Sequence, residues 1–125
     1  MKLRIFLVLA CAAFSPLVIA DTSPRIAVAD ARSLMIQALA ATNGEAHGIL
    51  IGTHAQAISQ RFGASAPIFI DVTTERRYLQ PGCSRLRVQF SQDGVLLPGT
   101  PTPRKQVIEF GINYCRDALP PQSLR

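Results

Sequence analysis

The sequence lacks the short motifs that identify many small enzymes and metal proteins. It contains no HExxH or CxxC motif, no GxSxG nucleophile elbow and no glycine-rich phosphate loop. His47 and His54 are separated by glycines that would break a shared helix, so we expect solvent or helix-cap histidines rather than metal ligands. Asp71 and Glu75 are expected to pair with arginines rather than to act as catalytic acids. We therefore expect a protein without enzymatic activity, cofactor or metal.

Long apolar runs, internal repeats and blocks of like charge are also lacking after residue 20. A transmembrane helix needs about 20 consecutive, mostly apolar residues. Residues 21–125 are therefore expected to form one small soluble domain with a flexible C-terminal tail and no membrane-spanning segment.

The first twenty residues show the pattern of a cleavable export signal. The basic start MKLR is followed by the apolar run IFLVLACAAF and by small or tolerated residues before Ala20. Cleavage after Ala20 would deliver residues 21–125 to the periplasm and, by removing Lys2 and Arg4, would lower the formal charge from +5 to +3. So weak a basic balance does not indicate a nucleic-acid partner.

A lipoprotein is the alternative, because VLAC at residues 8–11 resembles a cleavage box that would acylate Cys11. The apolar core before Cys11 is short, however, and the segment after it is apolar where a polar tether is usual. Both features favour cleavage after Ala20 over lipid anchoring. Without Cys11, Cys83 and Cys115 remain, and an even number of cysteines in an exported chain favours a disulfide.

The first part of the domain has helical spacing. Residues 24–42 carry an apolar stripe at that spacing and are followed by an Asn-Gly stop. The segment 48–52, GILIG, is either a buried connector or a very short strand. A second helix begins at Thr53, which with Gln56 has the spacing of a capping box.

The second part alternates with period two, which predicts strands over 68–79, 84–90 and 106–114. The order helix, helix, strand, strand, strand predicts an α+β fold. Two N-terminal helices would pack on one face of a three-stranded antiparallel sheet, with one disulfide and a polar opposite face.

The alternation of the last two strands also predicts their register. If Phe90 lies opposite Ile108 in an antiparallel hairpin, the apolar residues of both strands pair on one face. The same register places Cys83 opposite Cys115, at the short Cα separation that a disulfide requires. The two cysteines are therefore expected to form a structural disulfide at the open end of the hairpin.

Basic residues on these strands form a candidate binding face, made of Arg76, Arg77, Arg85 and Arg87. Such a face could meet an acidic protein, an anionic lipid or a wall polymer; alternatively, it is a solvated sheet face paired with nearby carboxylates. Nucleic acid is not expected, because the aromatic side chains point to the other face.

A candidate docking loop lies between the last two strands, where Val95, Leu96 and Leu97 stand in a connection rich in proline and glycine. Exposed apolar residues in a loop can form a docking patch. The same residues could equally fold under the sheet and complete the core.

The segments QPGCSRL, SQDGV and NYC followed by D and PP resemble those of small exported proteins encoded in conjugative-transfer and type IV secretion gene clusters of proteobacterial plasmids and integrative elements. The resemblance covers about half of the chain. It implies a periplasmic accessory that works by contacts with envelope proteins, among them secretion or transfer components. The alternative is a stand-alone envelope binding module, such as a hydrolase inhibitor or a ligand of the cell wall or another anionic surface.

Overall fold

A computed structural model describes residues 15–16 and 24–125. The cleavage site after Ala20 and the candidate lipidation site Cys11 lie outside the described residues.

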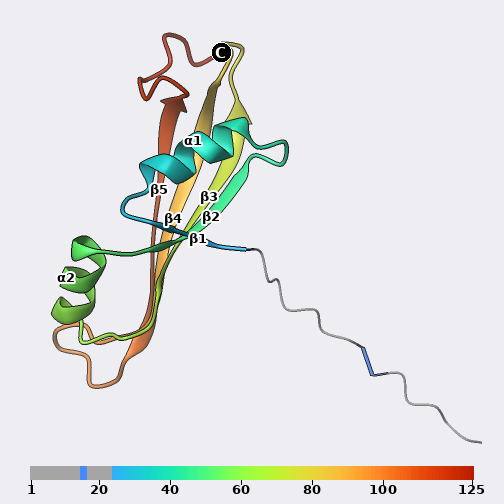
Figure 1. Cartoon of the computed structure of the whole chain (residues 1–125). Coiled ribbons are helices and arrows are strands. Elements are labelled where there is room, and N and C mark those ends of the chain that lie inside the picture. The colour runs from blue at the N-terminus through green and yellow to red at the C-terminus, as the bar shows by residue number, and fades with distance from the viewer. Residues whose placement is uncertain (1–14, 17–23) are drawn as a thin grey trace, which may run out of the picture.

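The described domain contains two helices and a five-stranded sheet (Figure 1). The elements are β1 (Ile26–Val28), α1 (Arg32–Ala40), β2 (Glu45–Leu50), α2 (Thr53–Arg61), β3 (Ile68–Arg77), β4 (Cys83–Val95) and β5 (Arg104–Cys115). The strands lie in the order β1-β2-β3-β4-β5; β1 and β2 are parallel and the other neighbours antiparallel. The fold is α+β, but the prediction of a three-stranded antiparallel sheet preceded by both helices is wrong.

The helix predicted over residues 24–42 is in fact a strand, a turn and a shorter helix. β1 pairs in parallel with β2, so α1 forms the crossover between two neighbouring strands. The carboxylate of Asp30 accepts a hydrogen bond from the backbone N–H of Arg32 (2.9 Å), which fixes the turn before the helix. The three residues of β1 are too short a run to be told from helical spacing.

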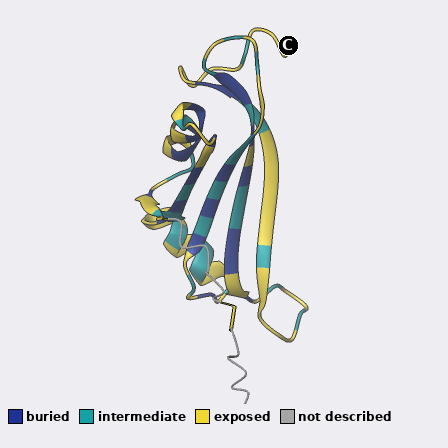
Figure 2. Cartoon of the chain, turned by 90° about the vertical axis from the view of Figure 1, so that its right-hand side faces the viewer, coloured by how far each residue is buried: buried dark blue, intermediate teal, exposed yellow. Residues whose placement is uncertain are grey.

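The hydrophobic core lies between α1 and one face of the sheet (Figure 2). The helix buries Leu34, Met35, Ala38 and Leu39 against alternate residues of the strands. Gly48 in β2 allows this close approach: a Cβ atom there would lie 2.8 Å from Cδ1 of Leu34 and 2.9 Å from the carbonyl oxygen of Ile26. The segment 48–52 thus belongs largely to a paired central strand rather than to a connector.

The second helix, α2, begins at Thr53 as predicted but is capped differently. Gly52 is the N-cap residue, with φ of +90°, and no side chain caps the helix, so the predicted capping box is wrong. No residue of α2 is fully buried. The helix lies near the β4–β5 connection, away from α1 (Figure 1).

The hairpin of β4 and β5 has the predicted register. Phe90 lies opposite Ile108, and Cys83 and Cys115 face one another and form a disulfide. The apolar pairs between these positions are Val88–Phe110 and Leu86–Ile112. The hydrophobic alternation, together with the matching of apolar residues across the hairpin, therefore placed both cysteines correctly.

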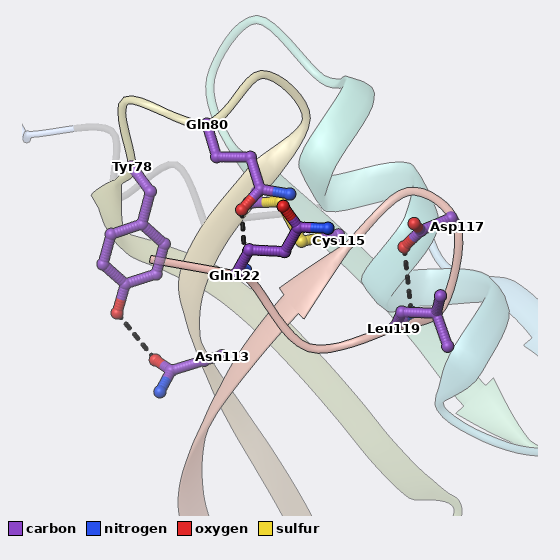
Figure 3. The surroundings of a disulfide bond; sticks show 8 residues. Tyr78, Gln80, Asn113, Cys115, Asp117, Leu119 and Gln122 are labelled. Atoms are coloured by element: carbon purple, nitrogen blue, oxygen red, sulfur yellow. Dashed lines mark hydrogen bonds between the residues drawn. A yellow bond between two sulfur atoms is a disulfide. The ribbon is translucent and has the colours of Figure 1, made fainter. Parts of the chain in front are cut away.

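The C-terminal tail has no regular secondary structure and folds back over the disulfide end of the sheet (Figure 3). The backbone N–H of Gln122 donates to the side-chain oxygen of Gln80 (2.7 Å). The N–H of Leu79 donates to the carbonyl oxygen of Arg125 (2.7 Å). These bonds hold the tail against the β3–β4 turn.

Candidate functional site

An apolar groove opens on the helix-bearing face of the sheet, between α2 and β5. Its volume is about 270 Å³. The side chains that form its walls include Ile58 and Phe62 from α2 and its end, Phe90, Ile108 and Phe110 from the strands, and Leu97 from the β4–β5 loop.

The groove exists because the two helices leave part of the sheet uncovered. The outer wall is β5, where Ile108 is 68% exposed and Phe110 is 44% exposed. The rings of Phe90 and Phe110 stack with centroids 6.3 Å apart, so this wall is a continuous apolar surface across two strands. Figure 2 shows the exposed length of β5 beside the buried stripes of its neighbours. An exposed patch of this kind typically marks an interaction site.

A buried glutamine holds α2 beside the groove. The side-chain amide of Gln92 donates to the hydroxyl of Ser59 (3.1 Å) and to the carbonyl oxygen of Ala66 (2.9 Å). The backbone N–H of Leu96 donates to the carbonyl oxygen of Phe62 (3.0 Å), which ties the β4–β5 loop to the end of the helix. The groove is therefore fixed by polar contacts although α2 buries little apolar surface.

The three residues of the candidate docking loop were expected either to form an exposed docking patch or to complete the core, and the structure shows some of each. Val95 is the last residue of β4 and is buried, at 4% exposure. Leu97 is half-buried and lines the groove. Leu96 stays exposed.

Three cations lie close to the groove. Arg61 ends α2 and lines a hollow that shares Phe62 and Leu97 with the groove, while Arg104 and Lys105 begin β5 beside the lining residue Gln106. None of the three makes an ion pair with another described residue. Among the described residues, the cations near the groove are accordingly unpaired, and one carboxylate, that of Asp93, follows the lining residue Gln92.

The candidate basic face is largely occupied by internal partners. The Nε of Arg87 lies 2.9 Å from Oε1 of Glu75 and 3.8 Å from Oε1 of Glu109. Arg85 donates to the side-chain oxygen of Asn113 (3.3 Å) and lies 4.0 Å from Glu75. Glu75 thus pairs with arginines, as its position on the strand suggested.

The four arginines do not share one face. A bulge between Thr74 and Arg76 shifts the register, so that Arg76 lies opposite Arg85, and Arg77 lies opposite Ser84 on the other side of the sheet. Arg77 there donates to the carbonyl oxygens that follow α1, those of Ala41 and Thr42 (3.3 and 3.2 Å). Arg76, by contrast, stacks over the ring of Tyr78.

A charged cluster on the polar face was missed from the sequence. Nδ1 of His47 lies 2.6 Å from Asp71, Nε2 lies 3.4 Å from Glu45, and Arg25 lies 2.9 Å from Asp71. Both ring nitrogens face carboxylates, and only the doubly protonated ring donates to both. The pairing joins β2 to β3, so no local sequence pattern announces it.

The cluster changes the acidity of its members. The hydrogen bond to Asp71 raises the pKa of His47, although burial opposes the shift. Burial favours the neutral form of Asp71, but the hydrogen bonds from His47 and Arg25 outweigh it, and the pKa of Asp71 is lowered. The arrangement links β2 to β3 through charged side chains.

The described part of the chain shows neither a metal-binding cluster nor a membrane-spanning helix. No group of three or more histidine, cysteine or acidic residues there could hold a metal ion. None of the described helices has both the length and the apolar character needed to cross a membrane.

Comparisons with known proteins found no relative. No family model matches the chain, and neither a curated protein nor a solved structure matches it. The assignment of function therefore depends on the geometry of the groove and on the sequence patterns described above.

Proposed function

We propose that this chain is a non-enzymatic periplasmic accessory protein, of a conjugation or type IV secretion apparatus, that acts by binding another protein at the groove. The observation that carries this proposal is the apolar groove between α2 and β5, with Ile108 and Phe110 open to solvent. Exposed aromatic and aliphatic side chains beside a preformed hollow are typical of protein-binding surfaces.

The charges around the groove indicate the chemistry of the partner. Arg61, Arg104 and Lys105 have no carboxylate partner among the described residues. A partner segment that places an apolar side chain in the groove and acidic residues beside it would complement both features. The polar face is a weaker candidate, because Glu75, Glu109 and Asn113 already contact its arginines.

The placement in the periplasm and in a transfer apparatus comes from the sequence. The basic, apolar and small-residue pattern of residues 1–20 supports export, and a disulfide is compatible with an oxidising compartment. The segments QPGCSRL and SQDGV support the link to transfer gene clusters.

A matched pair of variants tests the proposal. Leu97→Glu places a charge in the groove, whereas Ile51→Glu places one on an exposed apolar residue that does not line it. We expect Leu97→Glu to lower the frequency of conjugative transfer in the host and Ile51→Glu to leave it unchanged. A photo-crosslinking residue at position 97 should join the protein to a component of the transfer apparatus, and one at position 51 should not. Unchanged transfer after deletion of the gene, with no transfer component crosslinked, would contradict the proposal.

A further inference from the structure

We propose that β5 pairs with β5 of a second copy of this chain, so that two sheets join across a two-fold axis into one. β5 is a twelve-residue strand at the edge of the sheet, whereas the opposite edge, β1, has only three residues. A long, apolar, exposed edge is a template for another strand, and proteins that keep such an edge normally cover it. A second copy provides a cover of the same length.

The backbone of β5 is oriented for this pairing. The N–H of Arg116 donates to the carbonyl oxygen of Gly82 in the register of β4 and β5 (3.0 Å). In an antiparallel ladder the backbone N–H and C=O groups of successive residues point alternately to the two sides of the strand. The backbone groups of the even-numbered residues of β5 therefore point toward β4, and those of the odd-numbered residues point away from it. In agreement, the N–H of Cys115 turns away from β4 and donates to Leu119 (3.1 Å). Among the described residues of β5, the outward backbone groups without a partner are those of Lys105, Val107, Glu109, Gly111 and Asn113.

The side chains select the register. With Phe110 on the two-fold axis, Phe110 faces its own counterpart, and Ile108 faces Ile112 of the second copy. These are non-hydrogen-bonded positions, where opposed side chains are closest. All three lie on the face that carries the groove, where Ile108 and Phe110 are otherwise exposed. Pairing therefore removes apolar surface from water along the whole centre of the strand.

The charges on the opposite face agree with the same register. Gly111 allows the side chain of Arg85 to cross β5, since a Cβ atom at Gly111 would lie 2.8 Å from Cζ of Arg85. The guanidinium thereby reaches the free edge. With Phe110 on the axis, the residue opposite Gly111 is Glu109 of the second copy. Each Arg85 would then meet a carboxylate from the other chain, and the two-fold axis repeats the contact.

Neighbouring registers are less favourable. An axis at Glu109 would set two carboxylates against each other, and an axis at Ile108 would set Phe110 against Gln106. In the chosen register Arg104 lies opposite Arg116 of the second copy. Both are exposed and lie beyond the hydrogen-bonded stretch, where solvent and salt screen their repulsion.

This pairing goes beyond the proposed function and does not depend on it. The edge contact uses the outward backbone of β5 and shares the side chains of Ile108 and Phe110 with the groove, which is entered from the helix-bearing face. A monomer could still bind a partner at the groove, and a dimer could form without one.

Sedimentation equilibrium of the purified, disulfide-bonded protein tests the pairing. We expect a dimer in reversible equilibrium with the monomer. Val107→Pro removes one outward N–H and leaves the bonds to β4 in place, because Val107 belongs to the outward set; it should abolish the dimer. Val107→Thr keeps the N–H and should leave the dimer intact. Circular dichroism should show both variants folded.

Two further pairs of substitutions test the register. Phe110→Cys places two thiols opposite each other on the axis, and mild oxidation with diamide should link the chains, whereas Glu109→Cys should link poorly. Glu109→Arg should weaken dimerisation by about tenfold, and addition of Arg85→Glu should restore it. A wild-type protein that stays monomeric over the whole concentration range, or a Val107→Pro variant that dimerises as well as the wild type, would overturn the proposal and leave the edge to a strand from a different protein.

Discussion

Removal of the disulfide is predicted to cost a large part of the stability of the domain. Cys83 and Cys115 are 32 residues apart in sequence, and both are buried. The chain-entropy relation for a loop of this length gives about 3.7 kcal/mol at 25 °C. Because small domains have a total free energy of unfolding of about 5 to 15 kcal/mol, the double variant Cys83→Ala with Cys115→Ala should remain folded but marginal.

Urea denaturation of the wild type and the double variant measures this difference. Alanine is chosen over serine because a buried hydroxyl without a partner would add its own cost. With a slope of about 1.5 kcal/mol per molar urea, the midpoint should fall by about 2.5 M. Wild-type protein unfolded in a reductant should match the variant, and the variant itself should not respond to reductant. A loss below about 1 kcal/mol would refute the interpretation of this disulfide as a structural clamp.

Three other predictions follow from the core and the charged cluster. Leu34→Ala, at a fully buried position, should lower the free energy of unfolding by about 2.5 to 5 kcal/mol in urea denaturation, with Ile26→Ala at an exposed position as its control. Gly48→Ala should cost about 1 to 3 kcal/mol in the same assay, because the added Cβ meets Leu34 and a backbone oxygen. The raised pKa of His47 means that its stabilising contribution is complete below its unfolded pKa of about 6.5 and is lost as the pH rises through the folded pKa; His47→Gln should remove this pH dependence.

A specific outcome would contradict each of these three predictions. Equal losses for Leu34→Ala and Ile26→Ala would contradict the assignment of α1 to the core. A neutral Gly48→Ala would show that the helix does not approach β2 as closely as described. A wild-type pH profile of stability identical to that of His47→Gln would show that the contact between His47 and Asp71 contributes nothing.

The C-terminal half of the fold could be predicted because its signals are local. Strict alternation in β4 and β5 gave the faces, and matching apolar residues gave the register that places Cys83 opposite Cys115. The bulge between Thr74 and Arg76, which places Arg76 opposite Arg85, could not be predicted in this way. The assignment of residues to the two faces by odd and even numbers assumes an uninterrupted ladder. One extra residue in a strand moves every later residue to the opposite face.

The strands of the N-terminal half were not predicted, because pairing with other strands, rather than a local sequence pattern, determines their conformation. β1 is too short to show a period, and β2 contains both His47 and Gly48, which are poor indicators of a strand. Their strand conformation comes from pairing with β3 and from the crossover through α1. The groove was missed for the same reason: only Val95, Leu96 and Leu97 were singled out, and the walls come from elements far apart in sequence.

Amide hydrogen exchange along β5 is the most direct test of the claim that this strand is an interaction edge. Ile108, Phe110 and Ile112 bond to β4 and should be protected at every protein concentration. The amides of Glu109 and Gly111 point away from β4. They should be protected in concentrated solution, where the dimer forms, and should exchange rapidly after dilution to the monomer. If these two amides exchange at unprotected rates at every concentration while their neighbours stay protected, the edge is free and the proposed pairing is wrong.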